Sequence, residues 1–266
     1  MMKSGPFLIA TLLAKNEEDI LEHTLKYHIE EEGIDFIIAT DNGSKDKTKK
    51  ILQKYKEVKI IIDEFGDNHN QSAWVTRMAR IASTYDPKWI VHLDADEFWC
   101  NLFNLYKYDK KTLLIKVNKF YNHLINSQQF DFETTKFYTT QHNLKYIGIA
   151  ETPAKVIHRN ISDVCIENGN HNIIHNNNIV PTYSEEICVH HYPIRSYSQF
   201  ERKVRDGAVS LLKLNLVGVG QHWIDWYELY KNKLLHYEFN NIIKNSELFV
   251  HKNDCPCWFP THLIKN

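Results

Sequence analysis

Cysteine is scarce in this sequence, and long hydrophobic runs are missing from it. The five cysteines are odd in number and widely spaced, which fits reduced thiols in the cytosol better than a disulfide framework. Cys255 and Cys257 could bind zinc, but no second cysteine pair accompanies them. No apolar segment approaches the roughly 18 residues that cross a bilayer. We therefore expect a cytoplasmic protein whose membrane contact, at the inner face of the membrane, is peripheral.

An excess of charge of one sign is also absent. The 266 residues include 32 lysines and arginines and 33 aspartates and glutamates, which gives a formal net charge of −1. The basic residues are scattered rather than gathered into a stripe, so binding to nucleic acid is not expected. The length suits one α/β domain with a large buried core, and no repeat of fixed period interrupts it.

The first hundred residues alternate between strand and helix patterns that are joined by short links. This alternation predicts a Rossmann-like half in which a mostly parallel sheet is flanked by helices. A secretory signal is a poorer interpretation of the first apolar run, because one lysine precedes it and a helical pattern follows at once. The predicted strands are 7–14, 36–40, 58–62 and 89–93, and the predicted helices are 17–31, 48–53 and 71–84.

The pattern loosens beyond residue 100 and becomes helical again near the end. Stretches 112–120, 130–139 and 154–158 favour strands and are separated by polar loops. A helix is predicted from residue 197, and residues 223–235 form a second amphipathic span. The apolar residues that share one face of the first helix are Phe200, Val204, Ala208, Leu211 and Leu212.

The most informative segment is residues 90–97, where an apolar strand ends in three acidic side chains. A buried strand end is a poor place for unpaired negative charge, so Asp94, Asp96 and Glu97 should have a cation. In an extended backbone Asp94 and Asp96 point to the same side and can share one divalent ion, whereas Glu97 points away. Acidic triplets are also common in solvated turns, but this triplet follows a buried strand.

Two further polar clusters follow predicted strands. Asn16 and Glu17 come after the first strand, and the run from Asp41 to Asp46 comes after the second. Ligands of open α/β sheets bind at the carboxyl ends of the strands, so these clusters and the acids at 94–97 should share one crevice. Asp41 could accept a hydrogen bond from a nucleobase or a sugar hydroxyl, or close an Asx-turn, and Asp46 is expected mainly to cap the next helix.

The order and spacing of these segments resemble those of family 2-type glycosyltransferases with the GT-A fold. The likeness covers residues 6–100 well, and residues 190–196 more loosely resemble the later part of bacterial surface-polysaccharide enzymes. One departure is Asn42, at a position where the family commonly has a second acid. The matching segments are Asn16-Glu17, Asp41-Asn42-Gly43-Ser44-x-Asp46-x-Thr48 and Asp94-Ala95-Asp96-Glu97-Phe98.

The resemblance implies a domain organisation and a reaction. It implies a single GT-A-type domain over residues 1–266, with a nucleotide-sugar-binding half at 1–100, an acceptor-side half at 101–196 and a C-terminal helical extension at 197–266. The implied enzyme is an inverting glycosyltransferase that moves a sugar from a UDP-sugar to a glycan or lipid-linked acceptor in cell-surface polysaccharide synthesis. Its implied cofactor is Mn²⁺ or Mg²⁺.

The resemblance also implies roles for individual residues. Asp41 would contact the nucleobase, and Arg77 would help to hold it. Asp94 and Asp96 would hold the ribose and the metal. The remaining residues that we expect to bind the donor are Asn16, Glu17 and Lys203.

An inverting transfer also needs a carboxylate that takes the proton of the acceptor hydroxyl. Glu151 is a candidate because it follows a β-prone run among small residues, although a surface glutamate is the plainer interpretation. Glu97 is the second candidate. The residues that the sequence leaves open for the same role are Asp163, Glu167 and Asp206.

Two histidines could complete the metal site. His171 lies in a polar segment, and His191 follows an apolar strand. A neutral imidazole of either residue could bind the metal, or each could be a hydrogen-bonded histidine of the core.

Three rival functions stay open. A sugar nucleotidyltransferase shares the architecture but needs a glycine-rich loop after the first strand, and residues 13–18 contain no glycine. A metal-dependent hydrolase or phosphoesterase could be built on Asp94, Asp96 and His171. A non-catalytic relative would bind a nucleotide together with a metal ion and catalyse no reaction.

Overall fold

The computed structural model describes residues 5–63, 70–125, 137–140, 154–213, 221–244 and 247–248. The chain divides into two compact units. The first unit comprises residues 1–66, 70–120 and 153–189, and the second comprises 67–69, 121–152 and 190–266. The single domain predicted for 1–266, with its three parts, stays a prediction.

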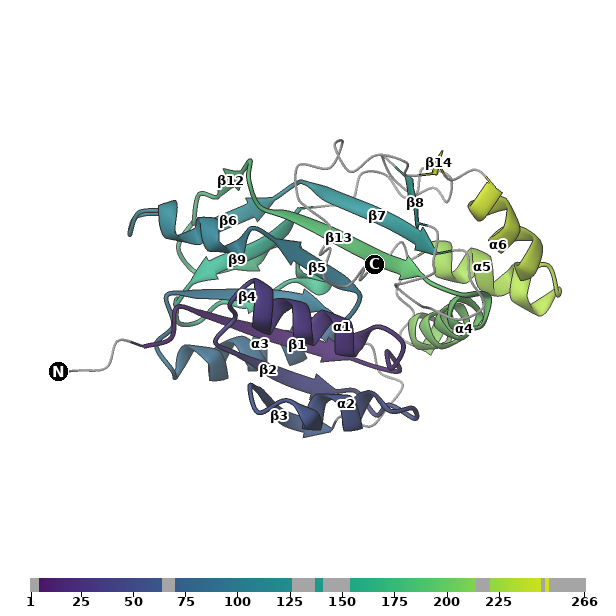
Figure 1. Ribbon diagram of the computed structural model, residues 1–266, viewed down its shortest axis with the longest axis horizontal. Helices are drawn as coiled ribbons and strands as arrows, with labels where there is room; N and C mark the ends of the chain where they lie inside the picture. The colour runs from purple at the N-terminus through teal and green to yellow at the C-terminus, as the bar shows by residue number, and fades with distance from the viewer. Residues whose placement is uncertain are drawn as a thin grey trace. The chain divides into compact units, whose positions relative to one another are not determined.

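The first unit is built on a seven-stranded, mostly parallel sheet with the strand order β12-β6-β9-β4-β1-β2-β3 (Figure 1). Strand β1 pairs in parallel with β2 and β4, and β2 pairs in parallel with β3. Strand β9 runs antiparallel to both β4 and β6. The strands are β1 (Leu8–Ala14), β2 (Phe36–Asp41), β3 (Val58–Asp63), β4 (Trp89–Asp94), β6 (Leu114–Val117), β9 (Lys155–Arg159) and β12 (Thr182–Ser184).

The predicted helices of the first hundred residues are present, and one of them starts late. Helix α1 (Leu21–Lys26) continues as a π-helix (Tyr27–Glu31), and is followed by α2 (Thr48–Lys54) and α3 (Gln71–Ser83). Helix α1 was expected to begin at Glu17. Asn16 has a left-handed backbone with φ of 56°, and the N–H groups of Glu17 and Glu18 donate to the side chains of Thr48 and Asp46. These contacts fold the segment before α1 against the turn before α2.

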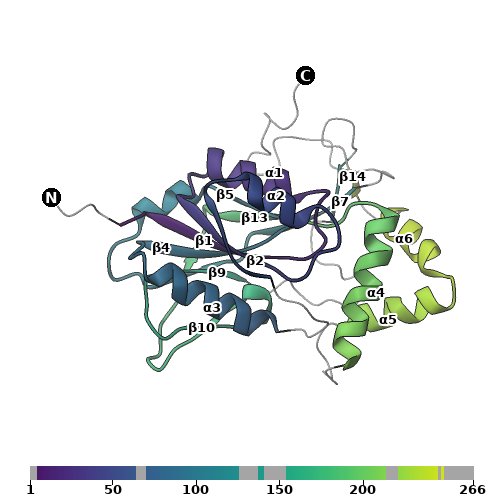
Figure 2. The ribbon, with the colours of Figure 1, turned by 90° about the horizontal axis from the view of Figure 1, so that it is seen from below.

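Apolar side chains fill both faces of the sheet. Leu8, Ala10 and Leu12 alternate along β1 and pack with the apolar side chains of α1 and α2. Ile9 points to the opposite face and packs in the same cluster as Val75 of α3. Figure 2 shows α1 and α2 on one side of the sheet and α3 on the other. A parallel sheet that is covered on both faces has near-continuous hydrophobic strands, which is the pattern the sequence displays.

Shorter elements complete the first unit. Strand β5 begins three residues after β4 ends, and a small antiparallel pair, β10 and β11, flanks a 3-10 turn. Cys100 and Cys165 carry free thiols, as expected, whereas Cys188 is in a disulfide, so the expectation of reduced thiols does not hold for Cys188. The elements are β5 (Glu97–Cys100), the 3-10 helices Leu102–Lys107 (η2) and Asn168–Asn170 (η4), β10 (Cys165–Ile166) and β11 (Ile173–Ile174).

The second unit combines an antiparallel sheet with three helices. Strand β8 pairs with β7 and with β14, and β13 is the neighbour of β7 on its other side. Helix α4 buries Phe200 and Val204 against Trp226 and Phe239, as its predicted apolar face requires, while Leu212 is half exposed. The elements are β7 (Phe120–Ile125), β8 (Phe137–Thr140), β13 (Cys188–Ile194), α4 (Tyr197–Lys213), α5 (Gln221–Lys231), α6 (Leu235–Lys244) and β14 (Glu247–Leu248).

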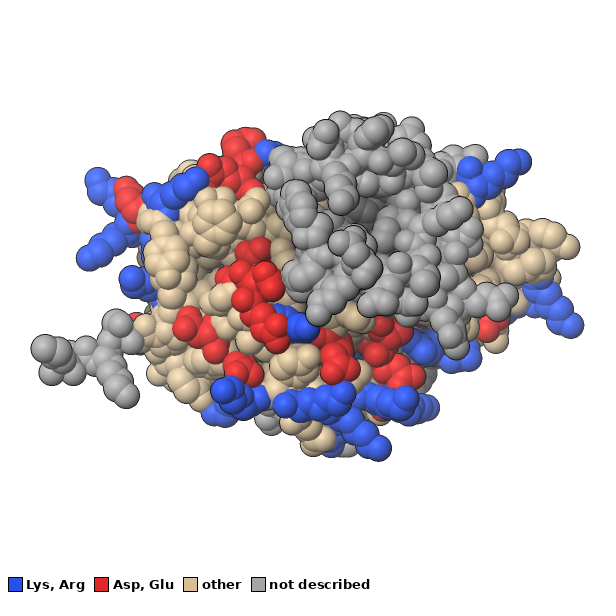
Figure 3. All heavy atoms as spheres, viewed as in Figure 1, with Lys and Arg blue, Asp and Glu red and all other residues tan. Residues whose placement is uncertain are grey.

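The surface carries both signs of charge. On the face shown in Figure 3, acidic and basic side chains lie next to one another. Exposed ion pairs such as Lys54 with Glu22 (3.1 Å) and Lys107 with Glu186 (2.7 Å) join some of them. Such exposed pairs contribute at most about 1 kcal/mol each. In the described ranges, no helix has both the length and the apolar character of a membrane span.

A buried histidine links the π-helix to β5. His28 Nδ1 contacts the carbonyl oxygen of Thr24 (2.8 Å), and His28 Nε2 accepts the backbone N–H of Trp99 (3.1 Å). These two contacts define a neutral ring that carries its proton on Nδ1. Burial lowers the pKa of His28 to about 4, because a charged ring there would lose its contact with water.

This histidine predicts a loss of stability in mild acid. The unfolded chain binds more protons than the folded chain between pH 6.5 and pH 4, so the stabilisation is complete above pH 6.5 and is lost as the pH falls. Between pH 7 and pH 5 the expected contribution of His28 is about 2 kcal/mol. Urea unfolding of the wild type and of His28→Gln at both pH values measures it. The same difference in His28→Gln as in the wild type would contradict the assignment, and His236→Gln, at an exposed histidine, is the control.

Candidate active site

The register of the sheet brings three predicted segments to one edge. Asp41 at the end of β2 pairs with Ala14, and Asp94 at the end of β4 pairs with Leu13. The two acids therefore flank the end of β1 from its two neighbouring strands, and Asn16 lies two residues after that end. The predicted gathering of polar residues at the carboxyl ends of β1, β2 and β4 is confirmed.

Ser44 ties the segment after β1 to the turn after β2. Its hydroxyl donates to Asp41 Oδ1 (2.5 Å) and accepts the backbone N–H of Asn16 (2.9 Å). Asn16 Oδ1 in turn accepts the N–H of Lys45 (2.7 Å). The backbone N–H of Ser44 also donates to Asp41 Oδ1 (3.2 Å), so Asp41 closes the turn through the residue three positions on, and not two as in the Asx-turn considered for it. Asp41 is buried and held in one orientation by these contacts.

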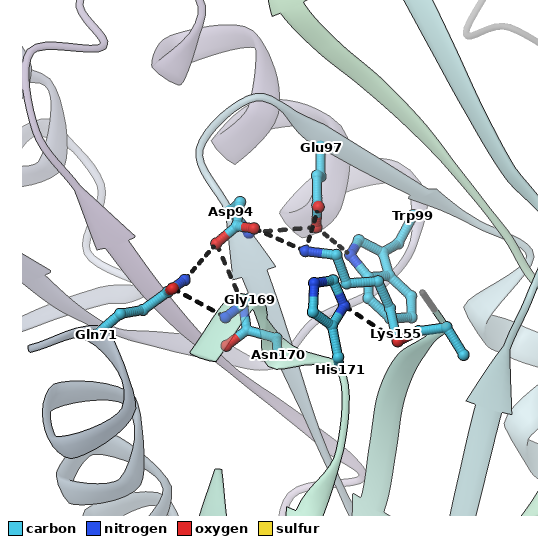
Figure 4. Close-up of polar contacts among 9 residues, drawn as sticks. Gln71, Asp94, Glu97, Trp99, Lys155, Gly169, Asn170 and His171 are labelled. Atoms are coloured by element: carbon cyan, nitrogen blue, oxygen red, sulfur yellow. Dashed lines mark hydrogen bonds and ion pairs between the residues drawn. The ribbon is translucent and has the colours of Figure 1, made fainter. Parts of the chain in front are cut away.

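The acidic segment turns sharply after Asp94. Strand β4 ends at Asp94, Ala95 and Asp96 form a turn, and β5 starts at Glu97. The alternation of an extended strand therefore stops at Asp94, and the expectation that Glu97 points away from the other acids is wrong. Asp94 and Glu97 meet at the same side chain, as Figure 4 shows. That side chain is Lys155, at the first residue of β9.

Lys155 is a buried cation shared by two acids. Its Nζ atom lies 2.8 Å from Asp94 Oδ2 and 2.6 Å from Glu97 Oε1. The side chains of Lys155 and Glu97 are 4% and 1% exposed, while that of Asp94 is 26% exposed. Glu97 Oε2 accepts the indole N–H of Trp99 (3.3 Å), which fixes the carboxyl group from the opposite side. The cation that the acids were expected to need is therefore supplied in part by the chain itself.

The three charges shift one another's protonation. Burial alone would lower the pKa of Lys155, but the charges and hydrogen bonds of Asp94 and Glu97 outweigh burial and raise it. Burial raises the pKa of Glu97 to about 8, against the pull of Lys155 and with the help of the nearby Asp94 and Asp96. Removing one partner of a buried ion pair costs about 3–5 kcal/mol, because it leaves the other charge without compensation.

The second oxygen of Asp94 is held from two other elements. Asp94 Oδ1 accepts the side-chain amides of Asn170 (3.2 Å) and Gln71 (3.4 Å). Gln71 is the first residue of α3, and its Oε1 accepts the N–H of Gly169 (2.9 Å) in the turn that carries Asn170. Ser72 N donates to the side chain of Asn168 (3.1 Å), so this 3-10 turn is attached to the start of α3. Asp94 is thus fixed by contacts from three parts of the sequence.

His171 lies beside this group, next to Lys155 (Figure 4). Its Nδ1 contacts the carbonyl oxygen of Ala154 (3.2 Å), so the neutral ring carries its proton on Nδ1 and leaves Nε2 as an acceptor. Burial, together with the positive charge of Lys155, lowers the pKa of His171 to about 4. A neutral imidazole is the form that binds a metal.

The other predicted residues are distributed over the chain. Glu17 and Arg77 are half-buried residues of the first unit, before α1 and on α3 respectively. His191 on β13 and Lys203 on α4 belong to the second unit. Glu151 lies outside the described residues, and its role stays a prediction.

Sequence reasoning missed Lys155, Gln71 and Asn170. Lys155 is one of 32 basic residues, and its partners lie about sixty positions away along the chain. One signal was present, because Lys155 opens a run of apolar residues that was predicted to be a strand. A lysine at the start of a buried strand needs an acidic partner, and a triplet of acids at the end of another strand needs a positively charged side chain.

The sequence from residue 12 to residue 149, more than half of the chain, matches the family described as "Glycosyl transferase family 2". The chain belongs to this family and is a glycosyltransferase. Its mixed α/β fold, with a mostly parallel sheet and C-terminal helices, is the predicted GT-A-type class. The matched range contains Asp41, Asp94 and Asp96 and ends before Lys155. No curated protein matches the chain.

Solved structures that are similar to the chain are distant from it. Residues 1–349 of TarS from S. aureus have a TM-score of 0.41 and 15% identity, over 77% of this chain and 65% of that one. The mannosyltransferase PcManGT from Pyrobaculum calidifontis, solved with GDP-Man and Mn²⁺, has a TM-score of 0.35 and 17% identity, over 43% and 36%. Glucosyl-3-phosphoglycerate synthase from Mycobacterium tuberculosis, solved with Mn²⁺, UDP and glucosyl-3-phosphoglycerate, has a TM-score of 0.31 and 18% identity, over 43% of this chain and 44% of that one. The chain spans less than two thirds of each.

Substitution of Gly169 tests how tightly His171 packs against the turn that contains Asn170. Its φ is +73°, and a Cβ atom there would lie 2.3 Å from Nε2 of His171. Gly33 has a similar φ of +71° with nothing within 4 Å of the added Cβ, so Gly33→Ala measures the backbone strain alone. We expect Gly33→Ala to cost about 1–2 kcal/mol and Gly169→Ala at least about 1 kcal/mol more, by urea unfolding. Equal losses in the two variants would show that His171 does not press against this turn.

Proposed function

We propose that this glycosyltransferase moves a sugar from a nucleotide-diphosphate sugar, a UDP-sugar, to a hydroxyl group of a glycan or lipid-linked acceptor. The reaction would use one divalent cation, Mn²⁺ or Mg²⁺. It would serve cell-surface polysaccharide synthesis in the cytoplasm, at the inner face of the membrane. The observation that carries the proposal is the register of the sheet, by which Asp41 and Asp94 flank the end of β1.

The turn after β2 has groups that suit a nucleobase. Ser44 holds Asp41 in place, and the buried Oδ1 atom of Asn42 has no hydrogen-bond partner within the described ranges. A buried acceptor without a partner is costly, and an N–H group of a base would satisfy it. The amide at position 42, which departs from the usual acid, is therefore compatible with this role. The other residues that we assign to the donor are Asn16, Glu17, Arg77, Asp94 and Lys203.

The acidic side chains after β4 supply part of the ligand set that a hard divalent cation takes. Carboxylate oxygens are the ligands that Mg²⁺ and Mn²⁺ take in proteins, and Asp96 offers such a group in the turn after β4. In Asp94 both oxygens are engaged, by Lys155 on one and by two amides on the other. As a metal ligand, Asp94 would therefore have to bind the ion in competition with Lys155. Nε2 of His171 and the imidazole of His191 are the nitrogen ligands that we propose.

The residues of the chain would assist departure of the leaving group. A nucleoside diphosphate leaves with two or three negative charges, and a bound divalent cation would supply charge that neutralises them. Lys155 adds a fixed ammonium group beside Asp94, and Lys203 would add another on the diphosphate. Inversion requires that the proton of the acceptor hydroxyl pass to a carboxylate. Because Glu97 is buried against Lys155, we favour Glu151 over Glu97 as this base.

Asp96→Asn tests the reaction and the metal assignment together. With a panel of nucleotide-sugars and Mn²⁺, we expect the wild type to hydrolyse at least one donor slowly. Asp96→Asn should lower this rate about 100-fold or more, because charge neutralisation of the leaving group contributes several kcal/mol. Asp109→Asn, at an exposed acid on a surface turn, should retain the rate. Release of the nucleoside diphosphate is the measured quantity.

The outcomes separate the rival functions. Full activity in Asp96→Asn would refute the metal assignment and leave the enzyme class intact. Cleavage of simple phosphate esters without preference for nucleotide-sugars would favour the hydrolase. Thermal stabilisation by UDP and Mn²⁺ with no turnover of any donor would indicate a non-catalytic relative. Absence of both hydrolysis and a thermal shift at millimolar UDP would overturn the proposal.

A further inference from the structure

Lys155 occupies the position at the strand-end acids that a divalent ion would need. Its ammonium nitrogen lies 2.8 Å from Asp94 Oδ2, and the whole side chain is 4% exposed. The Glu97 carboxyl group, at 2.6 Å, and the Trp99 indole behind it hold this arrangement from the protein interior. The contact is therefore a built part of the core and not a chance approach of a surface lysine.

A metal ion and this ammonium group are competitors for Asp94. Carboxylate oxygens bind Mg²⁺ and similar ions at about 2.0–2.6 Å. An ion bound to Asp94 Oδ2 at that distance would lie within about 5 Å of the lysine nitrogen, where two positive charges repel strongly in a partly buried site. Asp94 Oδ1 offers no simple alternative, because the amides of Asn170 and Gln71 already donate to it.

We propose that Lys155 is a built-in counter-cation that competes with the divalent ion for Asp94 and so keeps metal affinity low until a nucleoside diphosphate is bound. The diphosphate brings two or three negative charges, which compensate the repulsion between the ion and the ammonium group. Metal and nucleotide then strengthen each other's binding by the same factor, since coupling between two ligands is reciprocal. Lys155 is a positioning residue in this scheme. The metal and the nucleotide rest on the proposed function, whereas the competition for Asp94 rests on the contacts above.

Direct measurement of Mn²⁺ binding tests the competition without any turnover. Free Mn²⁺ is followed by electron paramagnetic resonance as the full chain is titrated, first without UDP and then with it. Without UDP, we expect Lys155→Met to bind Mn²⁺ at least tenfold more tightly than the wild type. Lys155→Arg, which keeps the charge, and Lys111→Met, which removes an exposed lysine on the turn before β6, should stay within threefold of the wild type.

A second substitution tests whether the gain in Mn²⁺ affinity depends on Asp94. In Lys155→Met with Asp94→Asn, the added affinity should disappear, because the released carboxylate is gone. If Lys155→Met does not fold, as judged by circular dichroism, Lys155→Met with Glu97→Gln removes the buried partner as well and leaves Asp94 to be tested. Mn²⁺ affinity equal to or below that of the wild type in the folded variant would overturn the proposal. Persistence of the gain without Asp94 would overturn it too.

The titrations with UDP test the coupling between nucleotide binding and Mn²⁺ binding. UDP should tighten Mn²⁺ binding at least tenfold in the wild type and by less than threefold in Lys155→Met. A wild type that binds UDP with no change in Mn²⁺ affinity would overturn the coupling. A wild type that binds no UDP and hydrolyses no donor would refute the proposed function instead, while the UDP-free comparison still decides whether Lys155 competes with the metal.

Discussion

One ammonium group between two carboxyl groups is the constraint on which the arrangement of the site depends. Three acids within four residues at the end of a buried strand would repel one another and leave charge without compensation in the interior. Lys155 reduces that cost and draws Asp94 and Glu97 together across the turn at Ala95 and Asp96. Because the lysine is buried, its position is fixed, and the orientation of Asp94 follows from it.

The surrounding contacts make this charge arrangement rigid. Gln71 at the start of α3 and Asn170 in a 3-10 turn both donate to Asp94, and Gln71 also accepts the N–H of Gly169. On the other side, Trp99 donates to Glu97 from its indole and to His28 from its backbone. A hydrogen bond to a charged group contributes about 1.5–3 kcal/mol, and one between neutral groups about 0.5–1.5 kcal/mol. Together they connect elements on both faces of the sheet to the two carboxyl groups that Lys155 holds.

The sequence predicted the parts of the fold and site that depend on local patterns. Apolar strands, amphipathic helices and the polar clusters after β1, β2 and β4 follow from residue spacing, and parallel pairing brings Asp41 and Asp94 together. Two local expectations failed for local reasons: left-handed Asn16 delays α1, and the turn at Ala95 and Asp96 redirects Glu97. Lys155 was missed because its role depends on pairing with a strand about sixty residues away, which no periodicity records.

Because β9 runs antiparallel to β4, its first residue lies beside the acids at the end of β4. A fragment that keeps these acids in their observed surroundings must therefore include β9. Strand β9 begins where β4 ends, so its first residue reaches Asp94, and the strand itself lies between β4 and β6. A fragment cut at residue 149, where the family match stops, would keep Asp41, Asp94, Asp96 and Glu97. It would also lose their internal cation and the strand that joins β6 to the rest of the sheet. The family-matched segment thus lacks one strand of the sheet, and its strand-end acids belong to a structure completed by later residues.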